Sequence, residues 1–296
     1  MVRWPRDWGL QVRMLGTMFL LALVYFIFIA VLAYIGIDSL LLVVIVTIVL
    51  LLQYFFSDRL ALFSMGARVV SEEEEPHLYE TLTRLCAIAG ITRPRLAIAN
   101  TSVPNAFATG RNAKNSVIAV TTGLRSMLDQ EELEAVLAHE LSHVKNRDVM
   151  VITFASLIST AAFFLFRTTL YTSRSGGKGG KQNLWFIIPL VAAAVWIISY
   201  LLIRALSRYR EYSADRGSAI LTGRPSVLAS ALMKISGMME RIPTKDLRDV
   251  EGMNAFFIIP AISGSSFLDL FSTHPSVEKR IAALERIEQE LRGHGV

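Results

Sequence analysis

The chain has 296 residues, of which 53% are hydrophobic, and its formal net charge is +5. Soluble globular proteins contain about 45–50% apolar residues, and here the excess is gathered in long blocks, which indicates a membrane protein. The basic charge forms no stripe with interleaved aromatic side chains, so no nucleic-acid partner is expected. The single cysteine, Cys86, excludes an intramolecular disulfide and zinc motifs that need several cysteines.

Two uncharged apolar blocks, residues 14–36 and 39–56, open the chain. Each is close to the roughly 20 residues that a membrane-spanning helix needs. Only Ile37 and Asp38 separate them, so we expect a tight helical hairpin. A cleaved signal peptide is the alternative, but its apolar region is about 7–15 residues long, which is shorter than the first block.

The segment that follows, residues 57–148, carries helix and strand signals without a long apolar block. A helix is expected to follow an acidic cap and to end at Gly90. A capping-box pattern, Asp129 with Glu132, predicts another helix from Gln130. The helix that ends at Gly90 is predicted over Pro76–Ala89, and strands are predicted over Arg95–Ala99 and Ser116–Thr121.

A third apolar block covers residues 149–166 and a fourth covers residues 185–203. Because no Gly or Pro occurs between Gly123 and Gly176, the helix from Gln130 can run unbroken into the third block. The fourth block can likewise continue to Arg216. The remaining predictions are a basic, Gly-rich loop over 172–183, a flexible stretch over 260–266, and a loop entering a helix at THPSVEKRIAAL.

The decisive motif is His139-Glu140-Leu141-Ser142-His143. Positions i and i+4 of a helix share a face, so both imidazoles can reach one zinc ion at about 2.0–2.1 Å. Glu140 is rotated off that face and can reach a water held at the metal, as in zinc proteases. The alternative is a pair of partly buried histidines beside a solvated glutamate.

A catalytic zinc needs a third protein ligand, and the best candidate is Glu211. Glu211 and Asp215 again have i, i+4 spacing, so one can bind the metal while the other accepts the N–H of a ligand histidine. The alternative is a charged helix exit from the membrane, with Arg208 and Arg210 snorkelling. If the third and fourth blocks form a hairpin, His143 and Glu211 emerge at the same membrane surface.

The chain carries four motifs, which in chain order are NAFATGR, HELSH with NRD, EYSAD and THPSVEKR. Through these motifs it resembles the HtpX family of membrane zinc metallopeptidases, and the resemblance covers nearly the whole chain. The same clan includes the CAAX prenyl endopeptidases. The resemblance implies zinc ligands at His139, His143 and Glu211, a general base at Glu140, and Asp215 as a partner of a ligand histidine. It also implies a substrate-binding edge strand over Asn105, Ala106, Phe107 and Ala108, and a role for His274 in stabilising the oxyanion.

The expected fold is mainly α: a polytopic membrane protein with about four transmembrane helices and a zincin-like catalytic domain of helices plus a small β-sheet. The predicted division is a first hairpin over 1–58, catalytic segments over 59–148 and 207–296, and a second hairpin over 149–206. Arg280 can pair with a core carboxylate or meet a substrate carboxylate, and the sequence leaves both open.

Charge around the first hairpin predicts which side of the membrane the site faces. Arg3, Arg6 and Arg13 precede it, whereas its connection carries only Asp38, so the N-terminus and the catalytic segments are expected in the cytoplasm. The basic loop after the third block opposes this, since it would lie outside. The zinc argument requires that the second hairpin cross either twice or not at all.

Three functions follow. The first is a cell-membrane zinc endopeptidase that cleaves damaged membrane and cytoplasmic proteins, a substrate class implied only by the family resemblance. The second is a processing peptidase of the CAAX prenyl endopeptidase type. The third is a non-enzymatic scaffold with a structural zinc, for which His274 is the best fourth ligand. The expected partners are protein or peptide substrates and the lipid bilayer.

Overall fold

The computed structural model describes residues 8–35, 39–173, 187–239 and 274–293. They belong to two compact units, and the predicted division into hairpins and catalytic segments stays a prediction. The first unit contains Phe55–Met150 and Ser207–Val296, and the second contains Trp8–Tyr54 and Val151–Leu206. Three regions named above lie outside the described residues: the connection at Ile37–Asp38, the loop from residue 174, and the stretch 260–266.

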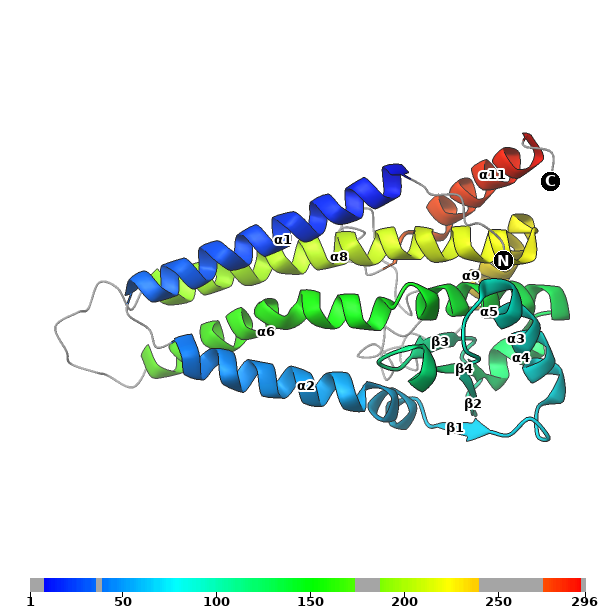
Figure 1. Cartoon of the computed structure of the whole chain (residues 1–296), viewed down its shortest axis with the longest axis horizontal. Coiled ribbons are helices and arrows are strands. Elements are labelled where there is room, and N and C mark those ends of the chain that lie inside the picture. The colour runs from blue at the N-terminus through cyan, green and yellow to red at the C-terminus, as the bar shows by residue number, and fades with distance from the viewer. Residues whose placement is uncertain (1–7, 36–38, 174–186, 240–273, 294–296) are drawn as a thin grey trace. The chain divides into compact units, whose positions relative to one another are not determined.

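Four long helices coincide with the four apolar blocks (Figure 1). Two are long and apolar enough to cross a membrane within the described residues: Trp8–Tyr34, with a mean hydropathy of 2.7, and Ile187–Thr222, with 2.1. That all four blocks cross stays a prediction. The helices are α1 (Trp8–Ile35), α2 (Ser39–Ser64), α6 (Asp148–Ser173) and α8 (Ile187–Thr222).

Inside the second unit, small side chains lie where helices meet. Ala162 of α6 and Ala192 of α8 are fully buried in a cluster with Phe28 of α1. Small residues let helices approach closely, which is how apolar helices gain packing energy in lipid. A buried hydrogen bond from the Tyr25 hydroxyl to the Ala155 carbonyl also joins α1 to α6.

The first unit contains a four-stranded sheet in the order β1-β2-β4-β3 (Figure 1). β2 and β4 are parallel, and each pairs antiparallel with an outer strand. This order makes β3 an edge strand, as the family resemblance implies for residues 105–108. The strands are β1 (Ala67–Val70), β2 (Arg95–Ala99), β3 (Ala106–Thr109) and β4 (Val117–Thr121).

Asn105 is a correction to the predicted edge strand, because β3 begins one residue later. Its side chain is buried, and its backbone makes two hydrogen bonds with Thr121 at the end of β4. The Asn105 N–H donates to the Thr121 hydroxyl at 2.9 Å, and the Thr121 N–H donates to the Asn105 carbonyl at 2.9 Å. One of these bonds is backbone to backbone and continues the pairing of β3 with β4, and in the other the hydroxyl accepts in place of a backbone carbonyl.

Helices cover the sheet and share one core with it. α5 (Gln130–Lys145) begins at the predicted capping box, with Asp129 accepting from the Glu132 N–H at 2.9 Å. α3 (Pro76–Ala89), which the acidic residues precede, also matches its predicted bounds, and Gly90 ends it with a left-handed φ of 68°. The remaining described helices of this unit are η1 (Ala113–Asn115), α4 (Thr122–Met127), α9 (Pro225–Met239) and α11 (Val277–Gly293).

The expectation that the helix from Gln130 runs into the third block is wrong. α5 ends at Lys145, and a new helix, α6, starts at Asp148. Between them Arg147 has a left-handed φ of 57°, the one positive φ at a non-glycine residue in the described part of the chain. A left-handed residue ends a helix by turning the backbone away from its axis. The fourth block, in contrast, does continue through Arg216, because α8 extends to Thr222.

Candidate metal centre

Three side chains from α5 and α8 converge in the first unit. The Nε2 atoms of His139 and His143 are 3.2 Å apart. The Glu211 carboxylate completes a triangle, with Oε2 3.5 Å from His139 Nε2 and Oε1 3.5 Å from His143 Nε2. α8 is held against α5 by the Ser218 hydroxyl, which donates to the Ala135 carbonyl at 2.7 Å.

This triangle fits a tetrahedral zinc ion. Ligand atoms about 2.0–2.1 Å from zinc at tetrahedral angles are about 3.3–3.4 Å from one another. Two imidazole nitrogens and a carboxylate oxygen are also ligands that zinc accepts. Among the described residues, the set of potential ligand atoms within 4.8 Å of one another comprises His139, His143 and Glu211. Three protein ligands leave one coordination position for water or substrate.

His139 is oriented by a carboxylate on its far side. Its Nδ1 lies 3.0 Å from Asp215 Oδ1, so the Nδ1–H can donate and Nε2 faces the triangle. Asp215 in turn accepts two bonds from the buried Arg280, from Nε at 2.9 Å and Nη2 at 2.5 Å. The structure therefore pairs Arg280 with a core carboxylate, one of the two possibilities that the sequence left open. It also assigns Asp215 to histidine contact rather than to the triangle.

His143 has an equivalent partner that the sequence reasoning missed. Its Nδ1 lies 2.5 Å from Oδ2 of Asp148, the first residue of α6. Asp148 also pairs with Arg210, which precedes the ligand Glu211. The only available signal was Asp148 itself, in the NRD that follows HELSH. In an unbroken helix, Asp148 would follow His143 by five residues and would lie on a different face of that helix.

Glu140 is buried beside the triangle. Burial and the charge of Glu211 raise its pKa to about 7, although the His139 ring and a hydrogen bond with the Ala108 backbone act in the opposite direction. A general base works best with a pKa near the working pH. The Ala108 contact also links Glu140 to the edge strand β3.

The charges of the buried site call for a divalent cation. Glu140, Glu211, Asp148 and Asp215 supply four buried carboxylates, whereas the buried cations among the side chains discussed here are the guanidinium groups of Arg210 and Arg280. With neutral histidines the deficit is two positive charges. A buried uncompensated charge is costly, so a bound Zn²⁺ would balance the group.

The two ligand histidines have pKa values shifted in opposite directions. Burial lowers the pKa of His143 to about 3, which keeps its ring neutral as a metal ligand requires. Burial also lowers the pKa of His139, but hydrogen bonds to Asp215 and Glu211 outweigh it and raise the value to about 9. A proton on His139 therefore supplies part of the positive charge when no cation is bound.

His274 lies at the same site from the chain before α11. It is buried, and its Nδ1 is 3.2 Å from Glu211 Oε2. It does not belong to the set of mutually close ligand atoms formed by the other three residues. Its position is compatible with contact to a substrate group near the metal, and its predicted role in stabilising the oxyanion stays a prediction.

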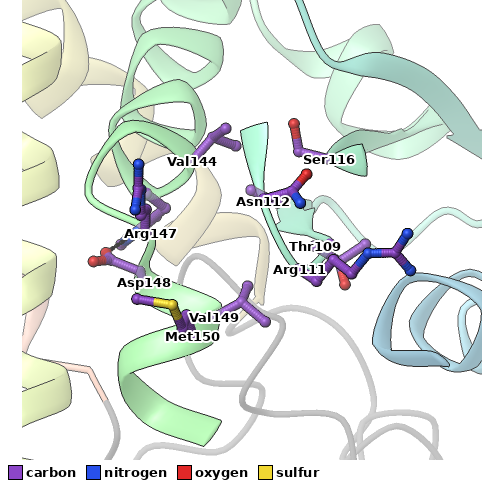
Figure 2. Close-up of a pocket in the computed structure, with 12 residues that line it drawn as sticks. Thr109, Arg111, Asn112, Ser116, Val144, Arg147, Asp148, Val149 and Met150 are labelled. Atoms are coloured by element: carbon purple, nitrogen blue, oxygen red, sulfur yellow. Dashed lines mark hydrogen bonds and ion pairs between the residues drawn. The ribbon is translucent and has the colours of Figure 1, made fainter. Parts of the chain in front are cut away.

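A pocket lies between the edge strand and His143. It contains about 280 Å³ of empty space, part of which is open to solvent. Figure 2 shows Val144, Arg147, Asp148, Val149 and Met150 from the α5–α6 junction on one side, and Thr109, Arg111, Asn112 and Ser116 from the β3–β4 connection on the other. A chain laid along β3 would therefore pass both the metal centre and this pocket.

Comparison with known proteins gives the family. The profile described as "Peptidase family M48" matches residues 72–288, which include every residue of the site. The chain belongs to peptidase family M48. The M48 chain is 59% identical to "Protease HtpX homolog 2" of Methanosarcina acetivorans, over 98% of this chain and 99% of that protein. It is 55% identical to "Protease HtpX homolog" of Moorella thermoacetica, over 96% of each chain.

The fold of the M48 chain is also found in a solved structure. Ste24p of S. mikatae matches with a TM-score of 0.58 at 17% identity, over 94% of this chain and 67% of that one. These findings confirm the predicted resemblance to HtpX proteases and the predicted membrane metalloprotease of family M48. They also confirm a mainly helical fold with a small mixed sheet.

Proposed function

We propose that this M48 peptidase is a zinc-dependent endopeptidase whose metal ligands are His139, His143 and Glu211. The observation that carries the proposal is the triangle of two Nε2 atoms and one carboxylate, with edges of 3.2–3.5 Å. A structural zinc would be closed by a fourth protein ligand. Within the described residues the set of close ligand atoms has three members, which supports catalysis over a scaffold role.

When bound, zinc supplies Lewis acidity, which activates a water molecule and polarises the scissile carbonyl. The protein side chains move the protons. Glu140 accepts a proton from the attacking water and delivers it to the departing amine. Asp215 and Asp148 hold the Nδ1 atoms of His139 and His143, so that each Nε2 faces the metal. The proposed role of His274, which lies 3.2 Å from Glu211, is to donate to the oxygen on which negative charge develops.

The edge strand supports an extended polypeptide as the substrate. β3 pairs with β4 along one side, so its other side can pair with an extended peptide. Ala106, Phe107 and Ala108 are the proposed contacts, and Asn105 holds the start of the strand. Such binding uses main-chain hydrogen bonds and reads few side chains, which suits cleavage of many damaged proteins. A processing peptidase of the prenyl type would share the centre, and preferential cleavage of a farnesylated peptide would reveal it.

The membrane setting is part of the proposal. The two long apolar helices, Trp8–Tyr34 and Ile187–Thr222, support insertion into a bilayer. The arginines before the first helix support a cytoplasmic N-terminus. A multi-pass protein of the cell membrane with a cytoplasmic centre would meet both membrane and soluble substrates.

The test is Glu140→Gln in the full chain, purified in detergent. We expect one zinc per chain in wild type and variant. Cleavage of an unfolded protein such as casein should fall by about 100- to 10,000-fold, the usual contribution of a general base. Glu134→Gln on the same helix is the matched control, because Glu134 pairs with Arg84 away from the centre. Undiminished cleavage by the Glu140 variant would refute the proposal.

A further inference from the structure

One carboxylate oxygen of Asp148 contacts both the ligand His143 and Arg210. Oδ2 of Asp148 lies 2.5 Å from His143 Nδ1 and 2.9 Å from Arg210 Nη2. Asp148 and Arg210 are both buried, with 4% and 6% of their surfaces exposed. An aspartate in this position without a cation would be a buried unpaired charge, which is destabilising. Arg210 therefore compensates the charge that His143 needs on its far side.

We infer that Arg210 is a positioning residue for the metal centre: it holds Asp148 so that His143 presents Nε2 to the metal. The inference rests on the proposed zinc site. A carboxylate behind a ligand histidine fixes the tautomer and the orientation of the ring. Here the carboxylate is itself fixed by Arg210, which is the immediate neighbour of the ligand Glu211 on α8.

Local backbone structure supports this role. The left-handed Arg147 separates α5 from α6 and places Asp148 at the start of the new helix. At the same junction the Asn146 side chain donates to the Ser213 hydroxyl of α8 at 3.2 Å. Two side-chain contacts thus join the junction to α8: the neutral contact of Asn146 with Ser213 and the ion pair of Asp148 with Arg210. Asp148 of the ion pair also contacts the ligand His143.

Arg210 and Arg280 contact their aspartates differently, so the two should differ in their tolerance of lysine. Arg280 contacts Asp215 through two nitrogens, Nε and Nη2, whereas Arg210 has one ion-pair contact with Asp148, through Nη2. A lysine offers a single nitrogen as a compact charge and cannot reproduce a two-nitrogen fork. Lysine should therefore replace Arg210 with little loss, but it should not replace Arg280.

The experiment measures metal binding as well as activity. Arg210→Gln, Arg210→Lys, Arg280→Lys and Asp148→Asn are compared with wild type in detergent, with the exposed Arg224→Gln as control. The readouts are the zinc dissociation constant from chelator competition, the absorption spectrum of the Co²⁺-substituted protein, and kcat and KM. Arg210→Gln and Asp148→Asn should weaken zinc binding by about 10- to 100-fold, as removal of such partners does, and change the cobalt spectrum.

Rescue distinguishes positioning from a general structural role. Arg210→Lys should bind zinc within a few-fold of wild type and restore the cobalt spectrum, whereas Arg280→Lys should not. An Arg210→Gln protein with wild-type zinc affinity and cobalt spectrum would overturn the inference. So would an Arg210→Lys protein as impaired as the glutamine variant. If wild type itself bound no zinc, the proposed function would fail instead, so the two failures are distinguishable.

Discussion

At the scale of single residues, the chemistry depends on Glu140 being buried but still able to lose its proton. Burial raises its pKa to about 7, while the positive charge of a bound zinc ion would lower it again. Its contact with the Ala108 backbone places it between the metal ligands and the strand proposed to hold the substrate. The same carboxylate can therefore face both the attacking water and the departing amine.

The pH dependence of cleavage follows from this carboxylate. Glu140 acts as a base only when deprotonated, so kcat/KM should fall as the pH falls through its pKa. Since the metal lowers the pKa from about 7, the midpoint of the acidic limb should lie below pH 7. The profile should be measured in a zinc buffer that keeps the site occupied, because acid also protonates the ligands. A midpoint above pH 7 would contradict this assignment.

At the scale of secondary-structure elements, the junction between α5 and α6 decides the geometry of the centre. α5 presents both histidines, and α6 must start in a new direction for Asp148 to reach His143. Arg147 makes that turn with a left-handed backbone. A left-handed conformation costs an L-residue about 1–2 kcal/mol, so the remaining contacts of the junction must offset this strain.

Substitution of Arg147 tests the junction. Arg147→Val should destabilise the protein by about 1–2 kcal/mol, because a β-branched residue tolerates positive φ poorly. It should also weaken zinc binding, since Asp148 would move relative to His143. Arg147→Gly accepts the same φ without strain and should keep the zinc affinity of wild type. Chelator competition and thermal unfolding measure both effects, and equal zinc affinity in the two variants would argue against the junction's role.

At the scale of the whole molecule, the metal should contribute to folding. Around the centre, four buried carboxylates stand against two buried guanidinium groups and the proton of His139, so loss of a divalent cation leaves net negative charge there when Glu140 is ionised. Chelation should lower the thermal-unfolding midpoint, since a ligand at 100 times its dissociation constant stabilises the folded state by about 2.7 kcal/mol.

The charge argument predicts how Glu140→Gln behaves without metal. At pH 8, above the pKa of about 7, the variant removes one uncompensated negative charge. Its metal-free form should therefore unfold at a higher temperature than metal-free wild type. Unfolding scans in detergent with excess chelator, at matched protein concentration, measure the difference. An unchanged midpoint would show that the buried charges are compensated in another way.

Membrane topology gives a further prediction at this scale. If both hairpins cross and the centre faces the cytoplasm, a cysteine replacing the exposed Glu73 should react with an impermeant maleimide only after cells are permeabilised. A cysteine replacing Lys178, which lies outside the described residues, should react in intact cells. The native Cys86 is buried and serves as an unreactive background. Equal protection of both positions in intact cells would indicate that the second hairpin does not cross.

Elements with local signals could be predicted from the amino-acid sequence. The spacing of His139 and His143 fixes two ligands on one helix face, and the Asp129 capping box fixes where that helix begins. The continuous pattern after the fourth block placed Glu211 on a long helix. Apolar length and composition likewise marked the four long helices, because a helix of that kind depends on its own residues.

Contacts between distant segments could be read only from the folded chain. The pairing of Arg280 with Asp215, and of Arg210 with Asp148, depends on how helices far apart in sequence pack, and the sequence left the partner of Arg280 open. The helix break at Arg147 carries no Gly or Pro signal. It is stable because contacts made by Asp148 and Asn146 with α8 outweigh the local preference to continue, and that balance is set by the folded chain.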